Sequence, residues 1–482
     1  MKLNIDNNTQ TMDYNSEYEG FSDNAIRLLS APKGNSKLAM AHFIAMSDLY
    51  NSKNNPNGYI SLGIAENVLS YDILKEKLIF ESDGNDGKEI MAAAAPLQSL
   101  TQYSEIGGIP QLRELIAKEL LQNQIFKGYK PTNEKLLVKK EQILISGGAT
   151  PLLENIFNLF CNQDEKCIIP SPFYPSFVYD AYQRFGVKVI AAKSEIFKDP
   201  LNKGTSEIID FKLDLKEFES LYNQGGVKMV LLCNPNNPTG YIFKPSEIKE
   251  LVKWCRNKKI HFVSDEIYAL SVFGSEDGSD GGNEFKSIYE ILEGDLGEYV
   301  HVLNGFSKDF CLNGYRIGYF YSQNETVFRY MLSTSAFYSC SNIAQYTAIN
   351  ILKDREYLER FIKTNQSNLK ESYEFASNLL NQYSIPFIKS SSGVFLSLDL
   401  RACLKYLPND TTTDDDQDNT DPFSKEIKLW EEIFKNKVFL NSGKLCYFEK
   451  PGFFRLVFTL PKDFIEQGIK RIAQVYNSLL NK

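Results

Sequence analysis

Short apolar runs alternate with amphipathic segments through the middle of the chain. Several of these runs are apolar along most of their length, as expected for strands that are covered on both faces. The predicted strands span residues 142–146, 167–169, 187–191, 227–233, 260–264, 299–303 and 316–321. Between some of them, as at 248–254, apolar residues recur at helical spacing. This alternation predicts a doubly wound, mostly parallel α/β domain over residues 90–335.

The pattern changes after residue 335, where long helical segments take over. The elements predicted there are helices at 342–362, 369–383 and 425–434, strands at 394–398 and 453–458, and a closing helix. This mixture predicts a smaller α+β domain over residues 336–482, which we expect the segment 21–89 to join. Residues 1–20 are polar and are predicted to be a disordered tail, and residues 409–422 form an acidic insertion for which disorder is also expected.

Composition narrows the class of protein. The formal net charge of −8 and a pI near 5.3 argue against a nucleic-acid surface. The eight cysteines are scattered without a C-x-x-C pair, which favours a reduced, cytoplasmic compartment. No apolar run is long enough for a signal peptide or a membrane span. Only three histidines are present, none at metal-ligand spacing, so no metal site is expected.

The residues with chemical potential follow the predicted strands. Lys308 lies in a Gly/Ser turn after an apolar run, and Arg316 follows eight residues later. A lysine amine becomes a nucleophile toward carbonyls when burial or a neighbouring cation lowers its pKa, and arginine can grip a phosphate with two hydrogen bonds. Asp265 and Tyr268 follow another strand and would share a face if that stretch is helical. The segment 234–240 contains two Asn-Pro steps at a strand end.

A further segment, 147–150, reads Gly-Gly-Ala-Thr and opens a predicted helix, whose free N–H groups and dipole favour an anion. Each of these motifs also has a purely structural explanation when it is taken alone. Asn, Pro and Gly dominate turns for conformational reasons, and most lysines are solvated surface residues. In parallel sheets, however, ligands gather at the carboxyl ends of strands, where these motifs coincide.

Taken in order, the motifs resemble those of pyridoxal-phosphate-dependent class I/II aminotransferases. The matching stretches are Gly-Ala-Thr at 148–150, Pro-Phe-Tyr-Pro at 172–175, Asn-Pro-Asn-Asn-Pro-Thr-Gly at 234–240, Asp-Glu-Ile-Tyr at 265–268, Ser-Lys-x₇-Arg-Ile-Gly at 307–318 and Phe-Arg-Leu at 454–456. The resemblance extends from about residue 56 to the end of the chain. It implies an α/β fold-type I transferase with a smaller α+β domain, and pyridoxal 5'-phosphate as the cofactor.

The same resemblance assigns expected roles to single residues. Lys308 would form the Schiff base with the cofactor's aldehyde, and Asp265 would pair with the protonated pyridine nitrogen, which keeps the ring an electron sink. Tyr268 and Asn237 would hydrogen-bond the ring oxygen, and Tyr174 would stack on the ring. Lys308, Asp265 and Tyr268 are therefore the catalytic residues that the resemblance implies.

The remaining expected roles concern the phosphate, the substrate and a second subunit. The implied phosphate ligands are Ala149, Thr150, Ser307 and Arg316. Arg455 would clamp the carboxylate of an amino-acid substrate, a planar task that suits arginine. Tyr103 would reach the phosphate of a neighbouring subunit, which implies a homodimer. Gly305 departs from the family pattern, because many members carry serine there as another phosphate ligand.

Within the family, residues 55–72 and the triplet Ser307-Lys308-Asp309 are similar to 1-aminocyclopropane-1-carboxylate (ACC) synthases and ACC-synthase-like proteins. This branch converts S-adenosylmethionine to ACC and methylthioadenosine, and Glu66 would face the sulfonium of the substrate. A capping or turn role for Glu66 is equally compatible with the residues alone. Residues 103–108 depart from the Asp-Tyr-His-Gly of plant synthases and are closer to aminotransferases.

Three hypotheses therefore stay open at the level of sequence. The first is an ACC synthase, and the second is an aminotransferase that works between an amino acid and a 2-oxo acid. The third is a non-catalytic relative that binds the cofactor. The third is the weakest, because Lys308, Asp265, Tyr268 and Arg316 are all present.

Overall fold

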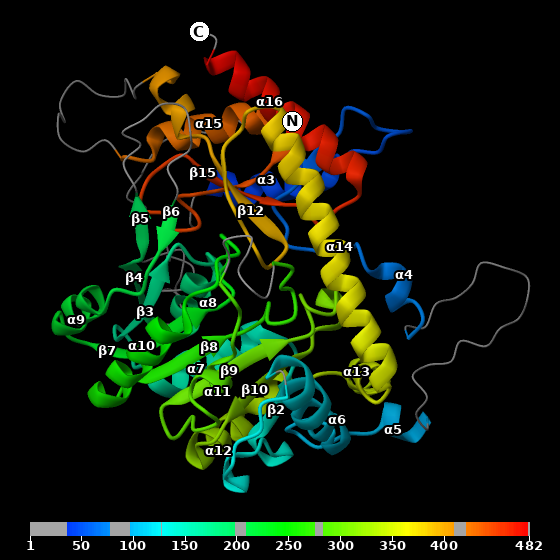
Figure 1. Cartoon of the computed structure of the whole chain (residues 1–482), viewed down its shortest axis with the longest axis vertical. Helices are drawn as coiled ribbons and strands as arrows, with labels where there is room; N and C mark the ends of the chain where they lie inside the picture. Colours follow the sequence, from blue (N-terminus) through cyan, green and yellow to red (C-terminus); the bar gives the residue numbers. More distant parts are fainter. Residues whose placement is uncertain are drawn as a thin grey trace, which may run out of the picture.

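The computed structural model describes residues 36–77, 97–126, 128–197, 209–274, 283–408 and 421–480. The predicted tail at 1–20 and nearly all of the acidic insertion at 409–422 lie outside these ranges. A seven-stranded sheet occupies the centre (Figure 1). Its strands are β2 (Ile143–Ser146), β3 (Lys166–Ser171), β4 (Lys188–Lys193), β7 (Val227–Cys233), β8 (His261–Asp265), β9 (Val300–Gly305) and β10 (Gly318–Ser322).

The strand order in this sheet is β2-β10-β9-β8-β7-β3-β4, and β10 runs opposite to all of its companions. The sheet is therefore mostly parallel, as expected. Because β10 is reversed, its first residue lies at the edge where β2 and β9 end, and Gly318 is in register with both Ser146 and Gly305. The predicted strand 316–321 begins two residues too early, since Arg316 has a left-handed φ of 56° and ends a short 3-10 turn.

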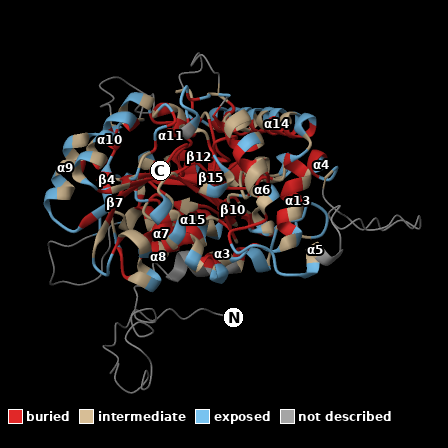
Figure 2. Cartoon of the chain, turned by 90° about the horizontal axis from the view of Figure 1, so that it is seen from below, coloured by how far each residue is buried: buried red, intermediate tan, exposed pale blue. Residues whose placement is uncertain are grey.

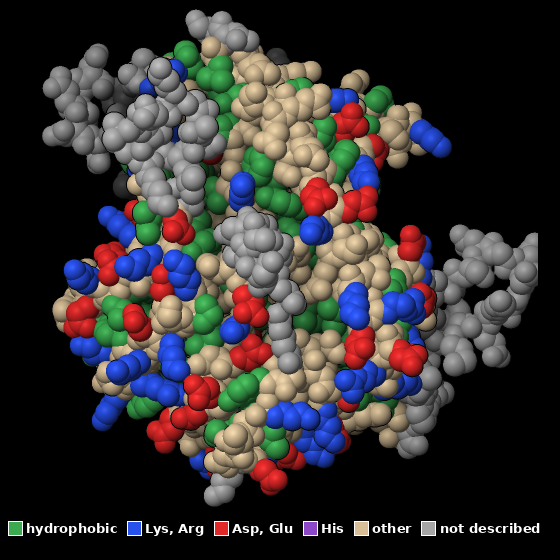
Figure 3. Space-filling view, in the orientation of Figure 1, with side chains coloured by type: hydrophobic (Ala, Val, Ile, Leu, Met, Phe, Trp, Pro, Cys, Tyr) green, Lys and Arg blue, Asp and Glu red, His purple; other side chains and the backbone are tan. Residues whose placement is uncertain are grey.

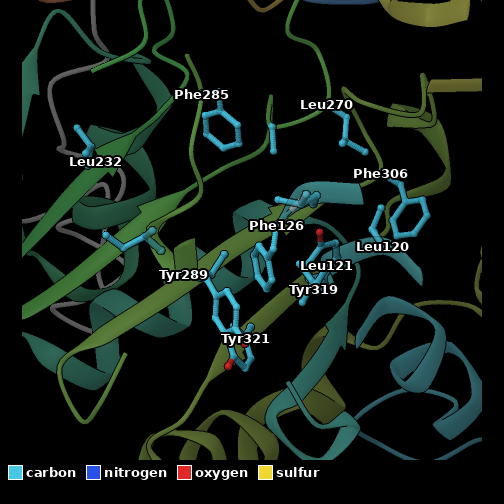
Figure 4. Packing of buried hydrophobic residues seen from close by; sticks show 14 of the residues in the cluster. Leu120, Leu121, Phe126, Leu232, Leu270, Phe285, Tyr289, Phe306, Tyr319 and Tyr321 are labelled. Carbon is cyan, nitrogen blue, oxygen red and sulfur yellow. The ribbon is translucent and has the colours of Figure 1, made fainter. Parts of the chain in front are cut away.

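Both faces of the sheet are covered, which explains why its strands are apolar throughout. Side chains alternate across a strand, so Val230 and Leu232 of β7 pack in one buried cluster while Met229 and Leu231 pack in another. Figure 4 shows part of the first cluster, where Phe126 stacks on Tyr289 and lies near Tyr319 of β10. In Figure 2 the buried residues follow the strands and the exposed ones follow the outer surfaces of the helices.

Helices form the two covering layers. The first cluster is covered by α6 (Pro110–Leu115) with its π-helical continuation Ile116–Ile125, α10 (Pro245–Lys258), α11 (Ile288–Ile291) and α13 (Asn342–Leu352). The second cluster is covered by α7 (Ala149–Phe160), α8 (Ser176–Phe185) and α12 (Glu325–Thr334). The remaining elements beside this sheet are α5 (Leu97–Thr101), α9 (Leu215–Asn223) and the hairpin β5 (Glu195–Phe197) with β6 (Ile209–Phe211).

A second, four-stranded sheet lies toward the C-terminus in the order β11-β12-β15-β14. Its strands are β11 (Phe387–Ile388), β12 (Phe395–Asp399), β14 (Asn441–Ser442) and β15 (Phe453–Val457), accompanied by α15 (Ser424–Lys435) and α16 (Lys462–Leu480). The prediction of one helix over 342–362 and another over 369–383 was wrong. The chain breaks at Asp354, whose side chain caps α14 (Arg355–Gln382) by accepting from the N–H of Tyr357.

The N-terminal segment runs beside this second sheet. β1 (Ile60–Ser61) pairs in parallel with β13 (Val438–Phe439), and α3 (Ser36–Ser47) lies close to both strands. Farther along, α4 (Tyr71–Leu74) lies beside α14, the long helix that runs from α13 to α16 in Figure 1, because the hydroxyl of Tyr357 donates to the carbonyl oxygen of Ile73. Of the segment 21–89, only residues 36–77 are described, and its assignment to the smaller domain remains a prediction.

The surface and the cysteines add three observations. All eight cysteines are free and buried, where they pack as small apolar side chains. Lysine and arginine side chains are interspersed with aspartate and glutamate on the face shown in Figure 3. Within the part of the chain that the structure describes, no helix combines the length and apolarity needed to cross a bilayer.

Candidate active site

A cavity of about 620 Å³ opens where the strands of the large sheet end. Ten of the twelve predicted site residues line it, although they come from segments far apart in the sequence. They are Ala149, Thr150, Tyr174, Asn237, Asp265, Tyr268, Ser307, Lys308, Arg316 and Arg455. The structure therefore brings together the lysine, the aspartate and both arginines, as a single cofactor and substrate would require.

Lys308 follows the end of β9, and its Nζ donates a 2.7 Å hydrogen bond to the carbonyl oxygen of Ala65. Burial, together with the positive charges of Arg455 and Arg316, lowers the pKa of Lys308 to about 8, while the negative charge of Glu66 opposes this shift. A substantial share of neutral amine near pH 8 is what a nucleophile toward an aldehyde, or a base toward a C–H bond, must supply.

Asp265 is the last residue of β8 and is almost fully buried. Its Oδ1 accepts a 3.2 Å hydrogen bond from the N–H of Ile267. Burial raises the pKa of Asp265 to about 7, so a nearby cation would be needed to keep it charged. The stretch after Asp265 is a turn rather than a helix, so the shared helical face proposed for Asp265 and Tyr268 does not exist. Both side chains nevertheless line the cavity.

A cradle of backbone and hydroxyl groups lies beside the lysine. Gly148, with φ of 113°, precedes the N-terminus of α7, so the free N–H groups of Ala149 and Thr150 lie at the helix end. A Cβ on Gly148 would overlap the guanidinium of Arg316, so only glycine lets this cation approach the helix end. Arg316 is oriented by a 2.9 Å hydrogen bond from its Nη1 to the carbonyl oxygen of Asn313. The cradle suits a phosphate dianion.

Arg455 lies on β15 and is almost fully buried. Its Nη1 donates to Oδ1 of Asn237 at 2.9 Å, and its Nη2 donates to the carbonyl oxygen of Gly63 at 2.6 Å. Its Nε has no hydrogen-bond partner among the described residues, although it is buried. A buried guanidinium with an unused N–H donor can bind a carboxylate, which is the role predicted for Arg455.

Two predicted residues do not line this cavity. The Glu66 side chain is exposed, and its Oε1 accepts a 3.0 Å hydrogen bond from Nδ2 of Asn313. Tyr103 lies fully exposed on the loop before α6. Their substrate and inter-subunit roles therefore remain predictions.

Comparison with known proteins identifies the family. Residues 63–472 match the family model described as aminotransferase class I and II. The chain belongs to the aminotransferase class I and II family. Proteins of this family depend on pyridoxal phosphate, so the predicted family and cofactor are confirmed.

Curated relatives of this aminotransferase-family protein include ACC-synthase-like protein 1 of Bos taurus, 30% identical over 89% of this chain and 78% of the relative. ACC synthase 7 of Arabidopsis thaliana is 28% identical over 88% of each chain. Among solved structures, an aspartate aminotransferase mutant from Thermus thermophilus superposes with a TM-score of 0.70 at 19% identity, covering 95% of this chain and 99% of that one. This likeness confirms the predicted fold class.

The residues of this aminotransferase-family protein fit pyridoxal phosphate. The glycine cradle with Arg316 fits the phosphate group, the buried Asp265 fits a protonated ring nitrogen, and Lys308 fits the aldehyde. The backbone packing beside Lys308 explains the glycine at position 305. A Cβ there would lie 2.7 Å from the carbonyl oxygen of Ile317, so the serine found in many family members could enter only if the backbone shifted.

Several cavity residues escaped prediction from the sequence. The backbone carbonyls of Gly63 and Ala65 accept hydrogen bonds from Arg455 and Lys308. Because every residue has a carbonyl group, residue types do not indicate which carbonyls belong to a site. Asp180 on α8 also lines the cavity, with a buried Oδ2 that has no partner among the described residues. The outer wall is formed by His42, Ile64, Tyr179, Phe439, Asn441 and Leu445. The resemblance of residues 55–72 to ACC synthases pointed toward the segment that carries Gly63 and Ala65, but not to these carbonyl groups.

Substitution of Gly318 by alanine is expected to destabilise the protein and weaken cofactor retention. A Cβ at this position would lie 2.7 Å from the backbone N of Ala149, where neither backbone can yield easily. Such overpacking costs about 1–3 kcal/mol. The measurement is the denaturant midpoint, together with cofactor absorbance after gel filtration. Gly314→Ala is the matched control, because its Cβ would meet nothing within 4 Å. Equal effects in the two variants would contradict the close-approach explanation.

The pH dependence of cofactor capture should report the amine of Lys308. Because the pKa of Lys308 is about 8 and the neutral form reacts, the rate at which cofactor-free protein binds pyridoxal phosphate should level off above pH 8. It should fall about tenfold for each pH unit below that. Stopped-flow absorbance measures this rate. In Arg455→Met the profile should move to higher pH, since a positive charge that lowers the pKa is removed. An unmoved profile would show that Arg455 does not influence this amine.

Proposed function

We propose that this protein is an ACC synthase that converts S-adenosylmethionine to ACC and methylthioadenosine. The observation that carries the proposal is the set of curated relatives, which include synthases from Oryza sativa subsp. japonica and Arabidopsis thaliana matched over most of their lengths. The cavity supports it, because a carboxylate-binding arginine and a partly neutral lysine face the same space. An α-amino acid fits between them.

In the proposed reaction Arg455 binds the substrate carboxylate and thereby orients Cα toward Lys308. The neutral amine of Lys308 takes the proton from Cα. When bound, pyridoxal phosphate supplies the sink for the electron pair that this proton leaves behind. Cα then bonds to Cγ, the Cγ–S bond breaks, and methylthioadenosine leaves with the sulfur electron pair. Asp265, Tyr268 and Asn237 hold the ring, and Tyr174 packs on it.

We also propose a role for Glu66 and a homodimer. The carboxylate of Glu66 lies near enough to influence the charge of Lys308, which supports a place close to a sulfonium substrate. Tyr103 is fully exposed, and Ile106 and Phe337 are further large apolar side chains at the surface. An exposed apolar group of this kind supports a second copy of the chain as partner, with Tyr103 reaching its phosphate. The free cysteines support a cytoplasmic location.

An aminotransferase is the second candidate, and the loop after Tyr103 favours it. This loop carries a glutamate, Glu105, which forms a 2.7 Å ion pair with Arg113 and has no counterpart in the Asp-Tyr-His-Gly of plant synthases. Small differences of geometry around one cofactor decide the fate of the substrate, so a local departure can change the reaction.

One assay separates the candidates. Purified protein with pyridoxal phosphate is given S-adenosylmethionine, and ACC and methylthioadenosine are quantified by mass spectrometry. Parallel reactions contain amino-acid donors with 2-oxo acids. ACC formation that is lost in Arg455→Met supports the synthase. Transamination without any ACC would overturn it in favour of the aminotransferase, and cofactor binding without either product would favour a non-catalytic relative.

A further inference from the structure

The segment 63–70 is an irregular stretch of chain that meets both arginine and lysine of the active site. The carbonyl oxygen of Gly63 accepts from Arg455, and that of Ala65 accepts from Lys308. Only a short bridge of β1 with β13 precedes it, and α4 follows it. It has no regular ladder of its own, and apart from one backbone hydrogen bond, from the N–H of Val68 to the carbonyl oxygen of Thr459, its contacts with other elements are made largely by side chains.

Asn365, in the middle of α14, is a buried side chain that anchors this segment, alongside Asn368 of the same helix and Thr459, which donate to the carbonyl oxygens of Leu69 and Glu66. Its Oδ1 accepts two hydrogen bonds, from Nδ2 of Asn67 and from Oγ of Ser70, both at 2.9 Å. Asn365 is 1% exposed and its two donors are also buried. Buried side-chain hydrogen bonds of this kind are costly to break, because a buried polar group that loses its partner has no water molecule to replace it.

The same amide also bonds to the residue that follows the active-site lysine. Nδ2 of Asn365 donates to the carbonyl oxygen of Asp309, the neighbour of Lys308, at 3.3 Å. The Asp309 side chain faces the other way, where its oxygens accept from Oγ of Ser271 at 2.6 Å and from the N–H of Leu270 at 3.0 Å. These contacts fix Asp309 to the turn that follows Tyr268. Asn365 thus ties segment 63–70 to the turn that follows β9 and carries Lys308.

The contacts form a closed circuit. From Lys308 it passes through Asp309 to Asn365, continues through Asn67 to Ala65, and returns through the 2.7 Å hydrogen bond to Lys308. We propose that Asn365 is a positioning residue, which sets where segment 63–70 lies relative to Lys308 without touching substrate or cofactor. The inference rests on the proposed function, since it concerns how Lys308 and the segment together receive a substrate.

The test compares Asn365→Leu with Ser377→Ala in the holoenzyme. Leucine keeps the volume of the side chain and removes all three hydrogen bonds. Ser377 is a control on the same helix, because among the described residues its hydroxyl donates only to carbonyl oxygens within α14. Hydrogen exchange followed by mass spectrometry should show faster exchange in peptides covering 60–70 in Asn365→Leu and not in Ser377→Ala. This result does not depend on which reaction the enzyme catalyses.

Kinetics supply the second measurement. A misplaced positioning group costs up to about 100-fold, so kcat/KM should fall about 10- to 100-fold in Asn365→Leu, mostly through KM, while cofactor absorbance is unchanged. Asn67→Ala should behave similarly, and the double variant should lose little more than Asn365→Leu alone, because the two residues act through one bond. If Asn365→Leu does not fold, Asn67→Ala and Ser70→Ala carry the same test.

Two outcomes would overturn the inference. One is unchanged exchange over 60–70 in every folded variant of the circuit. The other is a set of independent, fully additive losses for Asn67 and Asn365. If no substrate is turned over by the unaltered protein, the proposed function fails, whereas the exchange measurement still decides whether Asn365 positions the segment.

Discussion

Replacing Lys308 with alanine should abolish covalent cofactor binding and lower kcat/KM by about 10²- to 10⁴-fold, the range expected when a positioned general base is lost. Lys308 provides the amine in the cavity that is both buried and shifted to a pKa of about 8. Borohydride reduction followed by peptide mass spectrometry should find the cofactor on residue 308 in the unaltered protein and nowhere in the variant. Absorbance of the cofactor in the visible range should change in parallel.

The matched variant for this experiment is Lys308→Arg. It keeps a long cationic side chain that can still donate to the Ala65 carbonyl, but a guanidinium stays protonated and cannot act as nucleophile or base. We therefore expect Lys308→Arg to fold and to bind the cofactor noncovalently, with activity as low as in the alanine variant. Covalent cofactor recovered from either variant would refute the assignment of this lysine.

Replacing Asp265 with asparagine should lower kcat by about 10²- to 10³-fold, the loss measured when one preorganised electrostatic contact to a reacting group is removed. The buried carboxylate and a protonated ring nitrogen stabilise each other, because the cation lowers a pKa that burial has raised to about 7. Asparagine keeps the shape and can still accept from Ile267, but it carries no charge. Steady-state kinetics and a pH titration of cofactor absorbance measure the effect.

Glu426→Gln serves as the control for a buried carboxyl. Burial raises the pKa of Glu426 to about 7 as well, but its oxygens accept from the N–H groups of Lys444 and Gly452, away from the cavity lining. This variant should change stability and leave the pH titration of the cofactor unmoved. If both variants alter catalysis equally, the loss would reflect removal of any buried carboxyl group, and the specific role of Asp265 would be refuted.

Strand ends were the part of the site that sequence could predict. Lys308, Asp265 and the 147–150 segment each follow an apolar run, and a mostly parallel sheet brings such ends to one edge. Arg316 precedes its strand instead of following it. It joins the others because β10 is antiparallel, a fact of pairing that the local pattern does not contain.

The other features of the fold and the site could not be predicted from the sequence, for physical reasons. Backbone carbonyls such as those of Gly63 and Ala65 have no side-chain signature, and their partners are set by long-range packing. The break at Asp354 was missed because apolar spacing continues across it, and only the cap marks the new helix. Asn365 reads as one more polar residue within an amphipathic helix, so its buried contacts could not be anticipated.

The contact between Arg455 and Gly63 joins residues that are 392 positions apart. During synthesis the N-terminal segment must therefore wait for almost the entire chain to emerge from the ribosome before its carbonyls find their partners. Until β15 has been made, the large sheet can present Lys308 and the proposed phosphate cradle, but Arg455, the proposed clamp for a carboxylate, is missing. A nascent chain could thus hold the cofactor before it can hold a substrate.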